Sequence, residues 1–130
     1  MVEWDFDARD ALAARRARAE FTTYIRAECG EVDASSAELV LGELIGNVVR
    51  YAPGPAYVRA WVDDRFKVTI EVEDRGPGFI RPLVTSVDPL AESGRGLLIV
   101  ELLSDEFIVH CVANRGCRVR ARLSMKAAAC

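Results

Sequence analysis

Glu43 and Asn47 stand four residues apart in an apolar segment, which places both side chains on one face of a helix. The carbonyl oxygen of Asn47 is a suitable hard ligand for a metal ion on a triphosphate. The carboxylate of Glu43 can accept or orient the proton of an attacking hydroxyl. A structural role is the alternative, in which these groups bond a loop or Glu43 pairs with Arg50.

Asp74 ends a segment with the alternation of a strand, and Gly76 and Gly78 follow it. An aspartate at this position can accept a hydrogen bond from the exocyclic amine of a base. The glycines allow the following chain to turn sharply. A plain turn has the same spacing, so Asp74 is a candidate base contact only in combination with other groups.

Gly94 and Gly96 flank Arg95 at the predicted start of a helix that continues with Leu97. The unpaired N–H groups and the positive dipole end of a helix start suit phosphate oxygens, which glycines allow to approach closely. Arg95 would stand where a cation could meet the terminal phosphate. A loop hinge with an exposed arginine is the alternative. In combination, the three sets of residues predict a site for a metal-bound nucleotide.

The three sets of residues can form one site only if helices and strands bring them together. Hydrophobic periodicity predicts strands at 2–7, 56–62, 67–73, about 106–112 and 116–123, and helices at 8 to about 28, 35 to about 51 and 94 to about 104. Ser35 and Glu38 are expected to form a capping box, and Met125–Cys130 to be frayed. The order of elements predicts a two-layer α/β (α+β) sandwich, in which helices cover one face of a mixed, mostly antiparallel sheet.

The composition predicts one globular domain over residues 1–130, because 51% of the residues are apolar and 28% are charged. The net charge of −3 argues against a dedicated nucleic-acid binder. An apolar run of 18 residues and the pattern of a signal peptide are both absent from the sequence, so the prediction is a cytoplasmic protein without membrane contact. The polar residues Tyr57 and Arg59 and the Arg118–Arg122 row are expected on the sheet face away from the helices, or against a partner.

The four cysteines have neither a zinc-binding spacing nor a CxxC motif. Without an export signal they are interpreted as reduced thiols. Cys111 and Cys117 are expected in adjacent strands as small core residues, and a disulfide between them is the less favoured alternative.

The three sets of residues resemble the motifs of the GHKL ATPase superfamily, which includes gyrase, heat-shock chaperones, mismatch-repair ATPases and sensor histidine kinases. The similar motifs are the N box at Glu43-x-x-x-Asn47, the G1 box at Asp74-x-Gly76-x-Gly78 and the G2 box at Gly94-x-Gly96-Leu97. The resemblance covers about residues 5 to 123. The most similar branch is the anti-sigma-factor serine kinases of bacteria, on the basis of the arginine-rich first helix, the residues 47–52 and the short lid.

The resemblance implies the Bergerat fold and a site for ATP with Mg²⁺. It implies Asn47 as the metal ligand, Glu43 as the catalytic base and Asp74 as the adenine contact, with the glycines shaping a lid. Arg50 is interpreted either as a phosphate contact or as a partner of Glu43. In that branch the substrate is a serine or threonine of a small anti-anti-sigma (STAS-type) protein, the kinase also binds a sigma factor, and homodimers are typical.

Two residues depart from the superfamily pattern. Phe79 replaces the usual aliphatic residue after the second G1 glycine, and Cys117 follows Gly116 where Thr or Ser often begins the last strand. A binding module of the same fold that acts by protein contact alone is therefore the main alternative. A detached catalytic half working with a separate histidine-bearing protein is a third. Trp4 and Phe6, or the first helix, are candidates for a dimer surface.

Overall fold

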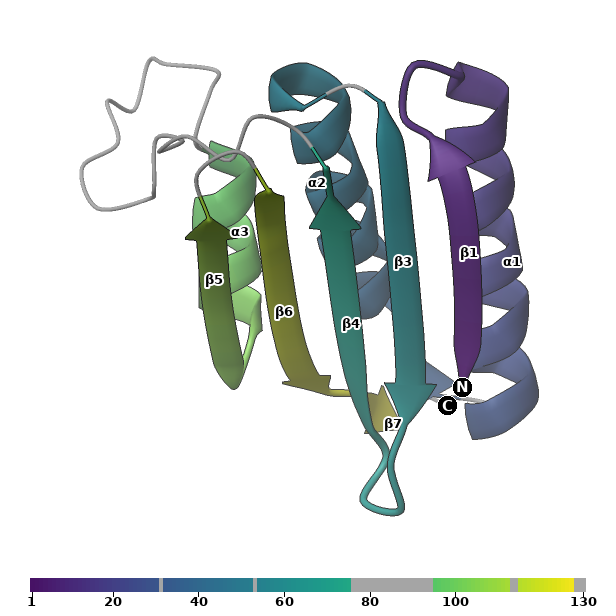
Figure 1. Cartoon of the computed structure of the whole chain (residues 1–130). Coiled ribbons are helices and arrows are strands. Elements are labelled where there is room, and N and C mark those ends of the chain that lie inside the picture. Colours follow the sequence, from purple (N-terminus) through teal and green to yellow (C-terminus); the bar gives the residue numbers. More distant parts are fainter. Residues whose placement is uncertain (31, 53, 76–94, 113–114, 128–130) are drawn as a thin grey trace.

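The computed structural model describes residues 1–30, 32–52, 54–75, 95–112 and 115–127. Its elements are β1 (Val2–Asp7), α1 (Ala11–Cys29), β2 (Val32–Asp33), α2 (Ser35–Tyr51), β3 (Pro55–Val62), β4 (Lys67–Asp74), α3 (Arg95–Leu103), β5 (Glu106–Val112), β6 (Gly116–Ser124) and β7 (Lys126–Ala127). The large sheet has the order β1-β3-β4-β6-β5 with antiparallel neighbours throughout. Helices α1, α2 and α3 lie on one face of this sheet (Figure 1). The predicted two-layer sandwich is confirmed.

The core lies between the sheet and the helices. In the central strands alternate residues face the helices, and the register sets Ile70 of β4 opposite Ala60 of β3 and Ala121 of β6. These three residues are fully buried, as are Phe21 of α1 and Leu44 of α2. The alternation in the strands and the apolar stripes of the helices therefore meet at a single buried layer. Within the described part of the chain, none of the helices combines the length and the apolar character needed to cross a bilayer.

Helix α1 begins later than the sequence predicts, and its end is as predicted. The Asp10 carboxylate accepts hydrogen bonds from the backbone N–H groups of Leu12 and Ala13, at 3.0 and 3.2 Å, which sets the helix start at Ala11. At the other end Gly30 has a φ of 62° and donates its N–H to the Arg26 carbonyl. A glycine adopts this left-handed φ without steric cost, so the helix stops there.

The capping box predicted for α2 is wrong. The helix already begins at Ser35, and its N-cap residue is Ala34, which has no side-chain oxygen to offer. Ala34 is buried, and its carbonyl accepts the first helical bond from the Glu38 N–H at 2.9 Å. The apolar contact of Ala34 with the core therefore sets this helix start in place of a capping side chain.

The prediction of a frayed tail is also wrong for Lys126 and Ala127. These residues form β7, which pairs with β2 in a small second sheet, Val32 opposite Ala127 and Asp33 opposite Lys126. Strands of two residues are too short to show an alternating pattern. The pairing also joins segments more than 90 residues apart, so the local sequence carried no signal for it.

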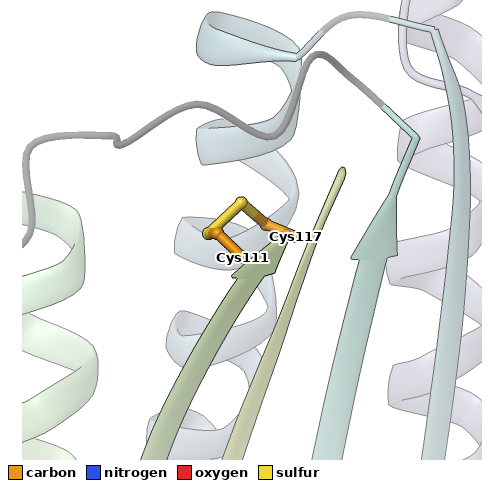
Figure 2. Close-up of a disulfide and its surroundings, with 2 residues drawn as sticks. All are labelled: Cys111 and Cys117. Atoms are coloured by element: carbon orange, nitrogen blue, oxygen red, sulfur yellow. A yellow bond between two sulfur atoms is a disulfide. The ribbon is translucent and has the colours of Figure 1, made fainter. Parts of the chain in front are cut away.

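Cys111 and Cys117 form a disulfide, which corrects the prediction of two reduced thiols (Figure 2). They are direct partners in the antiparallel register of β5 and β6, with their Cα atoms 4.1 Å apart. The prediction placed the two cysteines correctly in adjacent strands. It took them as reduced only because the sequence shows no export signal. Cys29 at the end of α1 is a free thiol, and burial raises its pKa.

The sheet face away from the helices carries a row of ion pairs, as expected for its arginines. Glu71, only 2% exposed, accepts hydrogen bonds from Arg59 and Arg120, and Arg118 bonds to Glu73. Burial raises the pKa of Glu71, but the bonds from Arg120 and Arg59 outweigh it and lower the pKa overall. These cross-strand pairs tie β3, β4 and β6 together on the face that lacks helices.

Asp63 makes the fold sensitive to acid. Its carboxylate accepts bonds from the Arg122 guanidinium at 2.7 Å and from the N–H groups of Lys67 and Arg65, which lowers its pKa from 3.8 to about 2. A carboxyl whose pKa is lower in the folded state stabilises the fold above its unfolded pKa, and this contribution is lost as the pH falls. In urea titrations the free energy of unfolding should therefore fall between about pH 4 and about pH 2. Asp63→Asn should reduce that fall, and the exposed neighbour Asp64→Asn, the control, should not.

Candidate functional site

Three element ends that carry the predicted site residues lie at the same end of the molecule. The C-terminal ends of α2 and β4 and the N-terminal end of α3 meet there, opposite the end that holds the β3–β4 turn (Figure 1). Helix α2 packs against both α3 and β4. The elements that carry the three predicted sets therefore meet at one end of the fold, with Glu43 in the middle of α2 and Asn47 nearer to its C-terminal end.

Asp74 is the last residue of β4 and is only 3% exposed. It follows the buried residues Val68, Ile70 and Val72 at intervals of two, so it belongs to the helix-facing side of the strand. It also lines a cavity of about 620 Å³ at the ends of β4, β5 and β6. A cavity of this volume lies within the usual range for small-molecule sites, about 300–1,000 Å³.

Gly116, the first residue of β6, packs directly on the backbone of Asp74. It has a φ of +102°, and a Cβ atom built on it would lie 1.9 Å from the carbonyl oxygen of Asp74. Both the close approach and the left-handed φ require glycine here. The sequence prediction gave Gly116 no role in the site. The sequence signal that could have identified Gly116 is its position between a short turn and the start of a strand.

Arginines surround the rest of the cavity. Arg75, Arg115 and Arg118 line it, together with Glu73 and His110. The hydrogen bond to Glu73 raises the pKa of Arg118, which also approaches Glu71 at 3.7 Å. Arg75 and Arg115 are exposed. Glu73 and Arg118 belong to the sheet face away from the helices, and the residues that line the cavity come from the ends of β4, β5 and β6. The cavity therefore lies at the end of the sheet, beside Asp74, and none of the described residues of α2 or α3 lines it.

Glu43 and Asn47 lie half-buried on α2 and do not line this cavity. In the part of the chain that the structure describes, neither side chain takes part in a hydrogen bond or an ion pair. An ion pair between Glu43 and Arg50 is therefore absent among the described residues, and the segment 76–94 lies outside them. Arg50 is exposed, and its guanidinium lies 6.0 Å from the ring centre of Tyr51.

The structure describes only part of the third predicted set, the residues at the start of α3. Arg95 and Gly96 form the first turn of α3, as predicted, and Leu97 is a core residue with 4% exposure. Gly76, Gly78 and Gly94 lie outside the described residues. Among the described residues, a group of three or more His, Cys, Asp or Glu side chains able to hold a metal ion is not found.

Comparison with known proteins gives the family. The model of the histidine kinase-like ATPase domain matches residues 6–123. Anti-sigma F factors from two strains of Clostridium botulinum, Eklund 17B (type B) and Alaska E43 (type E3), are each 30% identical over 101 residues. Each match covers 73% of this chain and 70% of the relative.

Solved structures agree with this assignment at the level of the fold. The RsbU and RsbW domains of Rv1364c from Mycobacterium tuberculosis match with a TM-score of 0.69 and 20% identity, over 99% of this chain and 34% of that one. The histidine kinase AdeS of Acinetobacter baumannii matches with a TM-score of 0.52 and 19% identity, over 96% of this chain and 68% of that one. The chain belongs to the histidine kinase-like ATPase domain family, in its anti-sigma-factor branch.

Proposed function

We propose that this chain binds ATP with Mg²⁺ and transfers the terminal phosphoryl group to a serine or threonine of a small anti-anti-sigma protein. The observation that carries the proposal is the meeting of α2, β4 and the start of α3 at one end of the fold. Membership of the anti-sigma-factor branch supports the type of substrate. A sigma factor as second partner, a cytoplasmic location and a homodimer belong to the same proposal.

The base of the nucleotide would be held at Asp74. This carboxylate is buried on the helix-facing side of β4, at the end of the strand where α2 and α3 also meet, and Gly116 leaves no room for a side chain beside it. A carboxylate in such a position accepts a bond from an exocyclic amine. Asp74 would therefore select a base that carries an amine, and Gly76 and Gly78 would let the following chain close over it.

The triphosphate would extend from Asp74 toward α2 and α3. The first turn of α3, with Arg95 and Gly96, offers backbone N–H groups and a positive dipole end to phosphate oxygens. Gly94 would allow close approach there, and Arg50 would add a positive charge from the end of α2. Asn47 would give Mg²⁺ its protein ligand. Metal-bound ATP supplies the phosphoryl group, and the Glu43 carboxylate would take the proton of the accepting hydroxyl.

The dimer surface is a further part of the proposal. Trp4 packs its ring against Phe21 of α1, with centroids 6.4 Å apart, and donates its indole N–H to Glu20. Its side chain is therefore engaged within the chain. The free edge of β1 and the outer face of α1 remain the candidates for contact with a second copy.

Titration with Mg-ATP in a calorimeter tests the proposal. The chain should bind Mg-ATP, and Asn47→Ala should weaken binding in the presence of Mg²⁺ more than in its absence, because the lost group holds the metal. Val49→Ala is the matched control, since Val49 is an exposed residue of the same helix. If Mg-ATP produces no heat and no thermal shift, the proposal is contradicted, and a module that acts by protein contact alone is favoured. An acid-labile phosphoryl product would instead favour a separate histidine-bearing protein.

A further inference from the structure

The Cys111–Cys117 disulfide lies at the same end of the fold as Asp74. It joins the end of β5 to the start of β6 (Figure 2). Cys117 is 3% exposed, and it lines the same cavity as Asp74. Cys111 is the more exposed of the two. Cys117 is thus a buried neighbour of the proposed base contact, and Cys111 lies nearer to solvent.

A short chain of contacts leads from the disulfide to the base contact. Cys117 is bonded to Gly116, and Gly116 packs against the carbonyl group of Asp74 with no space for a single methyl group. The covalent link to Cys111 restricts the movement of this first part of β6. Because Gly116 and Asp74 are in close contact, a change in the position of Gly116 must also move Asp74 or open a gap beside it.

The disulfide is not needed to hold its two strands together. Strands β5 and β6 pair over seven residues, from Glu106 opposite Arg122 to Val112 opposite Gly116. The linked cysteines are only six residues apart in the chain, so the entropic gain from closing this loop is at the small end for disulfides. The sheet should therefore persist when the bond is reduced. A bond that can open without unfolding the domain is suited to regulation.

We propose that Cys111 and Cys117 form a reversible redox site, and that the oxidised pair raises the affinity of the neighbouring site for Mg-ATP. This inference rests on the proposed function. A dithiol reductant would open the bond: its thiolate attacks one cysteine sulfur to give a mixed disulfide, and its second thiol then displaces that cysteine. The products are two cysteine thiols and the disulfide of the reductant, with two electrons and two protons transferred. Exchange with a small disulfide such as oxidised glutathione reverses the step.

The first experiment compares Mg-ATP affinity in the two redox states by calorimetry. Protein equilibrated with oxidised glutathione should bind about fivefold or more tightly than protein reduced with dithiothreitol. Cys111→Ser cannot form the bond and should bind weakly under both conditions. Cys29→Ser is the matched control: it removes the free thiol of α1 and should keep the full redox response. Peptide mapping of the oxidised protein should find the Cys111–Cys117 pair.

The second experiment uses the reciprocity of linked equilibria. If the oxidised pair tightens nucleotide binding, Mg-ATP must make the disulfide harder to reduce by the same factor. The measurement is the fraction of Cys111 and Cys117 that can be alkylated at a series of ratios of reduced to oxidised dithiothreitol. It is made with and without saturating Mg-ATP. A structural role for the bond alone would leave that titration unchanged.

The outcomes separate this inference from the proposed function. Equal Mg-ATP affinities in both redox states overturn the redox inference and leave nucleotide binding intact. Absence of binding in both states overturns the proposed function and this inference together. Loss of far-UV circular dichroism on reduction would show that the bond is needed for the fold, and so would contradict a reversible site. Alkylation of both cysteines in glutathione-oxidised protein would do the same.

Discussion

Replacing Glu43 with alanine should slow phosphoryl transfer by about 100- to 10,000-fold, the usual contribution of a positioned general base. Glu43 lies half-buried on α2, one helical turn before Asn47, and none of the described residues holds it in a bond. Its removal should leave Mg-ATP affinity nearly unchanged, because the carboxylate acts on the accepting hydroxyl and not on the nucleotide. A loss in rate without a loss in affinity is the pattern of a group that acts in the transition state.

The measurement is the single-turnover rate of phosphate transfer to a serine-bearing anti-anti-sigma substrate, with nucleotide affinity taken from calorimetry. Glu43→Gln should show a similar loss, because the amide keeps the size of the side chain and cannot accept the proton. Glu101→Ala on α3 is the control, since Glu101 is an exposed carboxylate on a neighbouring helix. If Glu43→Ala turns over at the normal rate, the assignment of Glu43 as base is wrong.

Replacing Gly116 with alanine should destabilise the domain by about 3 kcal/mol or more, because a strained φ and a direct clash act together. The new methyl group would meet the Asp74 carbonyl oxygen at 1.9 Å while the residue keeps a φ of +102°. The backbone of Asp74 or β6 must therefore shift. We also expect a loss of nucleotide affinity, because the shift falls on the proposed base contact.

Urea unfolding and Mg-ATP titration of the same variant check this result. Gly46→Ala is the matched control, since a Cβ at Gly46 would meet no atom within 4 Å in the structure. Gly46 is an interior residue of α2, so its replacement should stabilise the domain by up to about 1 kcal/mol. Equal stability of Gly116→Ala and the unsubstituted protein would show that β6 can move away from Asp74 without cost.

The sequence predicted the large elements because their periodicity is long. Strands β3, β4 and β6 have seven or more alternating residues, and α1 and α2 have continuous apolar stripes. The capping of α2, the β2–β7 pair and the disulfide were predicted wrongly, although α2 begins at the predicted residue. The β2–β7 pair joins segments that are distant in the chain, and the N-cap of α2 is a single buried alanine, so neither leaves a periodic pattern in the sequence. The disulfide joins adjacent strands that were predicted, and the error came from the expected redox compartment.

The chemistry of the candidate site could be predicted from the sequence, but the geometry of the cavity could not. Residue chemistry and spacing led to Asp74, Glu43 and Asn47, and the fold brings their elements to one end. The cavity itself could not be predicted, because β5 and β6 form much of its wall and are distant in sequence from the N box. Asp74 lines the described cavity and Asn47 does not. A shared cavity for the two residues therefore stays a prediction.

The start of β1 and strand β7 both lie at the opposite end of the molecule from the start of α3 (Figure 1). Strand β1 begins at Val2, and β7 ends the described chain at Ala127. A fluorescent protein or an affinity tag joined at either end would therefore emerge far from Asp74. A domain fused through β1 or beyond β7 should therefore leave the end of the fold that carries Asp74 uncovered.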